Sequence, residues 1–161
     1  MQDYNKRGSQ GQKFGGYSNS RSNGYQSKEQ QPTPTDFLNS HPFNNAWVTE
    51  GADEKLVDFA EAAGKYMAEN GLTNSKIRSV YGEIKRIQVG GFLHNHSSFF
   101  LLKPKMAYAV GRDPHNNGLK LFQEIFNLCF SQVGKEEKNY KNFCNLIEAV
   151  LAYHKAYGGK D

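Results

Sequence analysis

Basic side chains gather in the middle of this 161-residue chain at spacings that could hold a polyanion. If residues 72–90 form a helix with about 100° per residue, three cations fall on the side away from the apolar stripe: Arg78, Lys85 and Arg86. A second stripe puts an aromatic ring between two cations: Lys105, Tyr108 and Arg112. Cations bind phosphates, and an aromatic ring can stack on a base or ribose. The chemistry expected of these residues is therefore binding of RNA or another polyanion.

Charge is unevenly distributed along the chain, although the net charge is only +4. Residues 49–69 carry six acidic and two basic side chains, whereas residues 70–120 carry eight basic and two acidic ones. The predicted RNA-binding residues all lie in this basic block: Lys76, Arg78, Lys85, Arg86, Lys105, Tyr108, Arg112 and Lys120. The alternative interpretation is a solvated helix face, which is what most charge runs are.

Gly82 lies in the middle of the first cationic stripe, where it leaves a flat notch between cations. An exposed glycine inside a helix costs about 1 kcal/mol relative to alanine. Close approach of another backbone is a reason for glycine at this position.

Catalysis and metal binding are not expected. A nuclease needs clustered carboxylates for metal ions, or a histidine with a partner acid or base. His94 and His96 form the only close histidine pair, in a predicted loop with no cysteine or carboxylate nearer than Glu83. His154 falls on the apolar stripe of the last predicted helix and is expected to be a partly buried histidine with its hydrogen bonds satisfied. We therefore predict a protein that is not an enzyme and has no metal site and no cofactor.

The elements that must position these residues are helices. From residue 53 onward apolar residues recur at spacings of three and four, and no strand-like alternation is present. Gly71 is predicted to end the first helix in the left-handed conformation, and residues 93–98 are predicted to form a polar loop. The fold class is all-α, a compact bundle of about five helices: 53–70, a helix capped by Thr73 and ending at Gly90-Gly91, a short helix from Pro104 to Gly111, 116–133 and 136–157.

Residues 1–48 consist largely of Gly, Ser, Asn and Gln. Such a segment cannot offset the backbone entropy of about 1 to 2 kcal/mol per residue that ordering costs. We expect a disordered tail followed by a helical domain over residues 49–161. The three prolines of residues 32–43 are expected to block helix, whereas Trp47 and Val48 are expected to pack onto the domain. Loose RNA binding and simple solubilisation are both open roles for the tail.

The expected location is the cytoplasm. The N-terminal sequence has no apolar run typical of a secretory signal, and no segment approaches the ~18 apolar residues of a membrane span. Two cysteines are too few for a disulfide framework. No membrane partner is expected.

Three motifs occur in order along the basic block and the C-terminal part: LTNSKIR at residues 72–78, KMAYAVGRD at 105–113 and EAVLAYHKAYGG at 148–159. Together they resemble the small-subunit family of the type III-A CRISPR effector, the second protein of the Csm complex. The resemblance covers residues 54–159. The tail before residue 49 has no counterpart in the family pattern, and the loop at residues 89–100 looks longer than usual, so neither inherits a role.

The resemblance implies an accessory RNA-binding subunit without catalysis that acts in antiviral defence. Such subunits lie along the interior of the ribonucleoprotein filament, beside the repeating backbone subunit, other Csm subunits and neighbouring copies of themselves. They contact guide RNA and target RNA mainly through phosphates. The alternative is a helical protein–protein adaptor with an incidental basic surface. Its signature would be an exposed apolar patch, for which residues 99–102, Phe-Phe-Leu-Leu, are the candidate.

Overall fold

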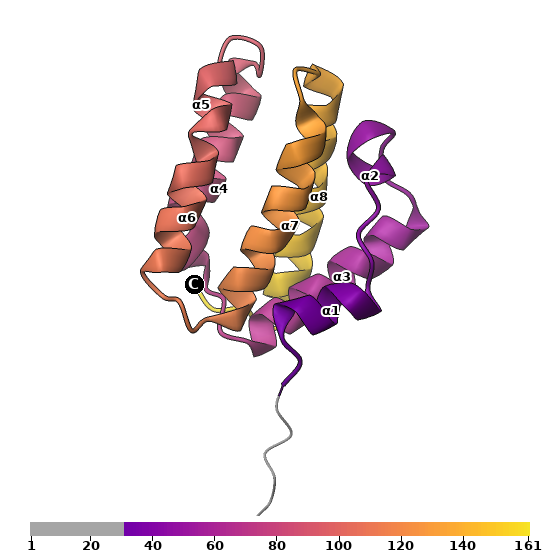
Figure 1. Cartoon of the computed structure of the whole chain (residues 1–161), viewed down its shortest axis with the longest axis vertical. Coiled ribbons are helices and arrows are strands. Elements are labelled where there is room, and N and C mark those ends of the chain that lie inside the picture. Colours follow the sequence, from indigo (N-terminus) through magenta and orange to yellow (C-terminus); the bar gives the residue numbers. More distant parts are fainter. Residues whose placement is uncertain (1–30) are drawn as a thin grey trace, which may run out of the picture. The chain divides into compact units, whose positions relative to one another are not determined.

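The computed structural model describes residues 31–161, and the predictions made for residues 1–30 lie outside this part. Within residues 31–161 the chain forms eight helices and no named strand, which confirms the all-α prediction (Figure 1). In chain order they are α1 (Pro34–Ser40), α2 (Ala46–Thr49), α3 (Glu54–Glu69), α4 (Asn74–Gly90), α5 (His96–Phe100), α6 (Leu102–Gly111), α7 (Asn117–Val133) and α8 (Glu137–Ala156).

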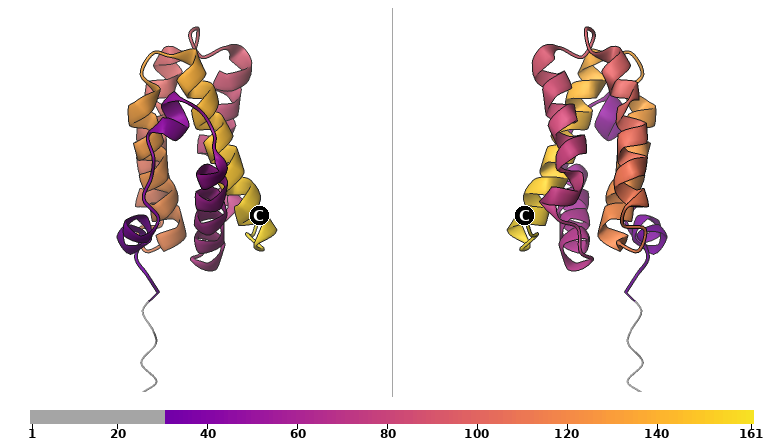
Figure 2. Two further views of the ribbon diagram at one scale, coloured as in Figure 1. Left: turned by 90° about the vertical axis from the view of Figure 1, so that its right-hand side faces the viewer. Right: turned by 90° about the vertical axis from the view of Figure 1, so that its left-hand side faces the viewer.

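The helices of residues 31–161 are arranged around the pair α7 and α8. Helix α3 packs across one side of this pair together with α1 and α2, and α4 and α6 pack on the other side (Figures 1 and 2). None of the helices in this part of the chain is long and apolar enough to cross a membrane. The arrangement buries one stripe of α4 and of α6 and leaves their other faces open to a partner.

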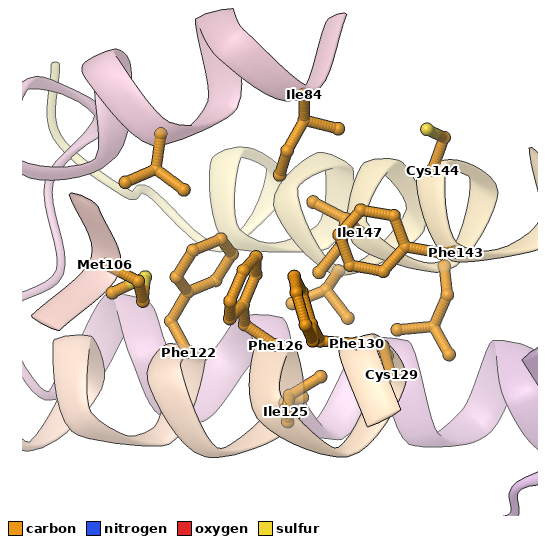
Figure 3. Close-up of a cluster of buried hydrophobic side chains, with 14 of the residues drawn as sticks. Ile84, Met106, Phe122, Ile125, Phe126, Cys129, Phe130, Phe143, Cys144 and Ile147 are labelled. Atoms are coloured by element: carbon orange, nitrogen blue, oxygen red, sulfur yellow. The ribbon is translucent and has the colours of Figure 1, made fainter. Parts of the chain in front are cut away.

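The core is rich in aromatic side chains from α7. Phe126 packs against Phe143 of α8 and Phe130 of its own helix, with 5.8 and 5.6 Å between ring centroids. Phe122 lies at the end of this cluster towards Met106 of α6, and Ile84 of α4 lies across the cluster (Figure 3). Burying a side chain of this size stabilises a fold by about 1.5 to 3 kcal/mol relative to exposure. The core therefore holds α4 rigidly against the central pair of helices.

The predicted glycine end of α3 is confirmed. Gly71 has a φ of +82°, and the next amide, of Leu72, donates to the Met67 carbonyl at 3.0 Å. This is the hydrogen bond of a Schellman-type helix end. At the other end of α3, Asp53 caps the helix and also accepts a hydrogen bond from Trp47 Nε1 at 2.7 Å.

The prediction of a disordered segment is wrong for residues 34–48, which form α1 and α2. Pro34 occupies the first position of α1, where a missing N–H costs nothing, so it starts a helix and does not block one. Thr33 and Asp36 close a capping box: the Asp36 amide donates to Thr33 Oγ1 at 3.2 Å, and the Thr33 amide donates to the Asp36 carboxylate at 2.9 Å. Trp47 and Val48 are buried, as expected.

Two details of the region around α4 also differ from the prediction. Thr73 precedes α4 as predicted, but its hydroxyl makes no capping bond and instead lies 2.9 Å from Ser75 Oγ. The predicted polar loop, residues 93–98, ends inside α5. The buried Phe99 of this helix stacks on Phe130 with 4.1 Å between ring centroids and so holds the segment against α7.

The third motif fixes α8 against α3 and the start of α4. His154 is fully buried, beyond the partial burial predicted, and its Nε2 lies 2.9 Å from the Leu72 carbonyl oxygen. Its Nδ1 has no hydrogen-bond partner within residues 31–161, so the prediction of satisfied hydrogen bonds holds for one ring nitrogen only. Gly64 of α3 approaches so closely that an added Cβ would lie 2.5 Å from the His154 amide nitrogen. After α8, the Lys160 carbonyl accepts from the Asn74 amide at 2.9 Å. The C-terminal residues thus help to set the position of α4.

Candidate nucleic-acid interface

Helix α4 carries the first cationic stripe because its opposite stripe is buried. Four side chains face the core: Ile77, Val80, Ile84 and Ile87. The remaining surface of α4 is bordered by two grooves, one towards α6 and one towards α8. Five of the eight predicted RNA-binding residues line one or the other of these grooves, whereas Lys85, Arg86 and Lys120 line neither.

The groove between α4 and α6 has a volume of about 330 Å³ and a polar lining. Four of the predicted residues line it: Lys76, Lys105, Tyr108 and Arg112. Tyr108 is 68% exposed, and the Arg112 guanidinium carbon lies 5.9 Å from the centroid of its ring. The second motif therefore places two cations and an open aromatic face beside a cation of α4. This is the combination expected for phosphate contact with stacking alongside.

The groove between α4 and α8 has a volume of about 520 Å³ and contains the predicted residue Arg78. Its other lining is more apolar and includes Tyr81 and Leu151. Gly82 also lines this groove, and an added Cβ there would meet nothing within 4 Å. The notch predicted at Gly82 is therefore open in the structure.

The first cationic stripe, predicted to put Arg78, Lys85 and Arg86 on one face, is divided in the structure. These side chains turn in different directions because their contact partners differ. Lys85 Nζ turns towards α8, where it pairs with Glu148, and also donates to Gln88 of its own helix at 2.6 Å. Arg86 turns the other way and contacts Glu83 and Asn95. Arg78 makes no ion pair within 4.0 Å among residues 31–161.

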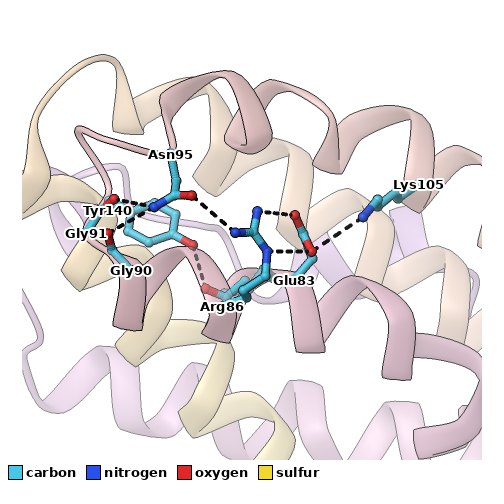
Figure 4. Close-up of polar contacts among 8 residues, drawn as sticks. Glu83, Arg86, Gly90, Gly91, Asn95, Lys105 and Tyr140 are labelled. Carbon is cyan, nitrogen blue, oxygen red and sulfur yellow. Dashed lines mark hydrogen bonds and ion pairs between the residues drawn. The ribbon is translucent and has the colours of Figure 1, made fainter.

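Carboxylates partner most of the other cations of this surface. Lys76 pairs with Asp113, and Glu83 accepts from Arg86 Nη2 at 2.7 Å and lies 3.5 Å from Lys105 Nζ (Figure 4). Within residues 31–161, Arg112 and Lys120 have no such partner. Partly exposed ion pairs contribute only about 0 to 1 kcal/mol, so a phosphate group can compete with these carboxylates.

The ion pairs keep the groups charged near neutral pH. Hydrogen bonds from Arg86 hold the pKa of Glu83 below its ordinary value, and the Lys76 ammonium does the same for the pKa of Asp113. The bond to Glu148 raises the pKa of Lys85. The surface is therefore a pattern of fixed positive and negative charges over the neutral range.

Lys120 lies apart from both grooves. It lies half-buried on α7 and lines neither groove beside α4. Lys120 belongs to the basic block of the sequence, but charge counts along a sequence do not show where in space each helix carries its charges.

Several groove residues escaped prediction. Ser75 and Ser79 line the α4–α6 groove and stand four residues apart on α4, so helical periodicity alone could have found them. Asp113 is part of the second motif and lines the same groove. Glu148 and Asn95 are distant in sequence from the cations they contact, and no pattern in the chain indicated these pairings.

The histidines and cysteines do not converge on a site. Within residues 31–161 there is no group of three or more His, Cys, Asp and Glu side chains that could hold a metal ion. His94 is exposed in the loop, while His96 Nε2 lies 3.3 Å from the Gly134 carbonyl oxygen. Both thiols are buried. Burial raises the pKa of Cys144 to about 12, so this side chain stays protonated at neutral pH and is unreactive.

The apolar stretch at residues 99–102 is only half exposed. Phe99 and Leu102 belong to the core, whereas Phe100 and Leu101 are 54% and 58% exposed. Val89 and Leu93, at the end of α4 and in the loop after it, are also exposed apolar side chains. This is the surface that an adaptor function would use.

A family model described as Csm2 Type III-A matches residues 50–160, which include all three motifs and every helix from α3 to α8. Comparison with curated proteins gives no match, and comparison with solved structures gives none either.

Proposed function

The chain belongs to the Csm2 type III-A family, and from this premise we propose that it binds the backbones of guide RNA and target RNA through α4 and α6. Family membership makes it the small subunit of a type III-A CRISPR effector complex. RNA binding by residues 49–161, at the interior of the filament, is the added proposal. It assigns the chain a non-catalytic role in antiviral defence in the cytoplasm.

The single observation that carries the proposal is the α4–α6 groove. It brings Lys76 from the first motif next to Lys105 and Arg112 from the second, with the exposed ring of Tyr108 between them. These residues are up to 36 positions apart in the chain, and only the packing of α4 against α6 unites them. Phosphate oxygens fit the cations, and the hydroxyls of Ser75 and Ser79 can donate to the same oxygens.

Recognition through this groove should be independent of RNA sequence. Its lining offers cations, hydroxyls and one ring, which contact phosphate, ribose and any base face. In a guide–target complex, base pairing can select the sequence while this surface follows the backbone. We therefore propose contacts with guide and target RNA that do not depend on their sequences.

The contrast of charge between α3 and the α4–α6 surface supports contacts with other subunits, including the repeating backbone subunit and neighbouring copies. Helix α3 carries four acidic and two basic side chains, whereas α4 and α6 together carry six basic side chains and one acidic one. Opposite charges on different sides of one subunit favour ordered placement in an assembly.

A helical adaptor is the second candidate function. The exposed apolar side chains Val89, Leu93, Phe100 and Leu101 favour it, because such side chains are suited to a protein partner. In this alternative the basic surface would be incidental, and RNA affinity would not depend on it.

The test compares the purified full chain with the variant Lys105→Ala, Arg112→Ala on two unrelated short RNAs, by fluorescence anisotropy over a range of salt concentrations. The proposal expects the wild type to bind both RNAs alike and the variant to bind both more weakly with a shallower salt dependence. Asp58→Ala on α3 is the control and should leave RNA affinity unchanged. Equal affinity of variant and wild type would favour the adaptor.

A further inference from the structure

Glu83 occupies a central place among the cations of α4 and α6. Its carboxylate accepts from Arg86 Nε at 3.1 Å and from Arg86 Nη2 at 2.7 Å, and it also lies 3.5 Å from Lys105 Nζ (Figure 4). The Glu83 side chain is only 18% exposed, whereas Arg86 and Lys105 are 52% and 43% exposed. One shielded carboxylate thus holds two accessible cations from two helices.

Arg86 is oriented from a second side as well. Its Nη1 donates to Asn95 Oδ1 at 3.2 Å, and Asn95 is itself held by its Nδ2, which donates to the carbonyls of Gly90 and Gly91 at 3.0 and 2.9 Å. The Nε and Nη2 edge of Arg86 faces Glu83. Through its Nε and Nη2 groups an arginine can donate two parallel hydrogen bonds to a carboxylate or to a phosphate.

We propose that Glu83 is a specificity-determining residue of the RNA surface, because its carboxylate competes with phosphate for Arg86 and Lys105. The inference rests on the proposed RNA-binding function and deepens it. In the free protein Glu83 occupies both cations, and on binding an RNA phosphate replaces it, first on Lys105, where the contact is longer. Replacement on Arg86 follows, so Glu83 loses both cation partners and part of the binding energy is used to displace it.

Competition of this kind favours a chain of phosphates over a single one. An isolated anion would contact only Arg86 or Lys105, and it would have to displace Glu83 to make that one contact. An RNA backbone reaches Lys76 and Arg112 of the adjoining groove at the same time, and the additional contacts offset the displacement. Since the pKa of Glu83 is lowered by Arg86, its carboxylate stays charged at neutral pH and the competition operates there.

The direct test is Glu83→Gln, which keeps the shape of the side chain and removes its charge. The variant should bind short single-stranded RNA roughly 3- to 10-fold more tightly at low salt, because a negative charge next to the phosphate is lost. The log–log salt dependence should become steeper by about 0.7, the value for one more neutralised phosphate in a single strand. Asp58→Asn makes the same change of charge on α3 and should change neither quantity.

A second measurement uses the unaltered protein, so it does not depend on the folding of a variant. In ¹⁵N NMR, addition of RNA should shift the Arg86 Nε–H resonance as phosphate replaces the Glu83 carboxylate. The same RNA should leave that resonance unchanged if Glu83 keeps its hold on Arg86.

The outcomes separate this inference from the function on which it rests. Wild-type protein that binds no RNA would overturn the proposed function and this inference with it. Wild-type binding combined with equal or weaker binding by Glu83→Gln, an unchanged salt slope and an unshifted Arg86 resonance would overturn only the role of Glu83.

Discussion

At the scale of single residues, the cations of the candidate interface differ in the groups that they contact in the free protein. Lys76, Lys85, Arg86 and Lys105 each contact a carboxylate, whereas Arg112 lies over the ring of Tyr108. A cation with a carboxylate partner must exchange it for phosphate, and a cation without one need not. Arg112 should therefore contribute more to RNA affinity than a paired cation in the same groove.

Replacing Arg112 by alanine should weaken RNA binding by roughly 3- to 10-fold for unrelated sequences and flatten the log–log salt slope by about 0.7. Anisotropy titrations at several salt concentrations measure both. The melting temperature should remain nearly unchanged, because an exposed charge contributes little to stability. A loss confined to one RNA sequence would contradict phosphate contact.

Asp113 gives a prediction about pH. Its pKa is lowered from the ordinary value of 3.8, first by the hydrogen bond from Lys76. A carboxyl group with a lowered pKa stabilises the fold above its unfolded-state pKa and loses that contribution as the pH falls through its folded-state pKa. Below about pH 4, the melting temperature of the wild type should thus fall more steeply than that of Asp113→Asn. Parallel curves for the two proteins would show that the pair adds no stability.

At the scale of elements, α3 packs on α8 at a glycine that leaves no room for a side chain, while α4 carries a glycine with open space beside it. An added Cβ at Gly64 would lie 2.5 Å from the His154 amide nitrogen and 2.6 Å from Tyr153 Cβ, whereas at Gly82 it would meet no atom within 4 Å. Glycine is required at position 64 by close helix packing, whereas at position 82 it lies on an open surface that would accommodate a side chain.

This difference predicts opposite effects of one substitution. Gly64→Ala should destabilise the protein by about 1 to 3 kcal/mol or more, because α3 must move away from α8. Gly82→Ala should stabilise it by about 0.5 to 1 kcal/mol, since alanine is the better helix former. Urea unfolding measures both. If Gly82 is kept for close approach of RNA or a subunit, Gly82→Ala should also weaken RNA binding or assembly, and stabilisation without any such loss would remove that explanation.

Most of the helices were predictable from the sequence, but which helices pack against one another was not. The long helices follow from apolar spacing, and the end of α3 from Gly71. The proline run predicts a break in helix, whereas Pro34 stands at the first position of α1, where proline is compatible with a helix. Helix α5 was missed because its fold depends on Phe99 stacking on Phe130 of α7, a contact that local composition does not reveal.

At the scale of the whole molecule, the segment before α3 belongs to the fold. Phe37 packs beside Phe59 and Tyr66, and Trp47 packs beside Phe59 with 5.0 Å between ring centroids. Tyr66 also donates to the Pro32 carbonyl at 2.6 Å. The described chain from residue 31 onward therefore behaves as one packed unit, which begins earlier than the position 49 expected from composition.

Truncation tests this boundary. A variant beginning at Thr49 loses the buried side chains of Phe37, Trp47 and Val48 and should be less stable by several kcal/mol than a variant beginning at Gln31. Thermal unfolding followed by far-UV circular dichroism compares the two. Equal melting temperatures would mean that α1 and α2 contribute little to stability.

The division of the candidate interface into two grooves could not be predicted, because it depends on α6 and α8 lying on opposite sides of α4. Charge counts along the sequence find the basic block, and helical periodicity puts Lys85 on one face with Arg86, although their ion-pair partners are on different helices. It also included Lys120, which lies on α7 outside both grooves. Residue types and periods are local properties, whereas the packing of the helices decides which residues the candidate interface brings together.

The central claim is that RNA follows the α4–α6 surface, and photo-crosslinking in the assembled effector tests it most directly. Complexes containing guide RNA and a target RNA that carries photoreactive uridines would be irradiated, digested and examined by mass spectrometry for peptides of this subunit. We predict crosslinks in α4 and α6, with Tyr108 among the modified residues, and their loss in the variant Lys105→Ala, Arg112→Ala. Crosslinks confined to α3 or to the Val89–Leu101 end, with none in the groove, would contradict the account.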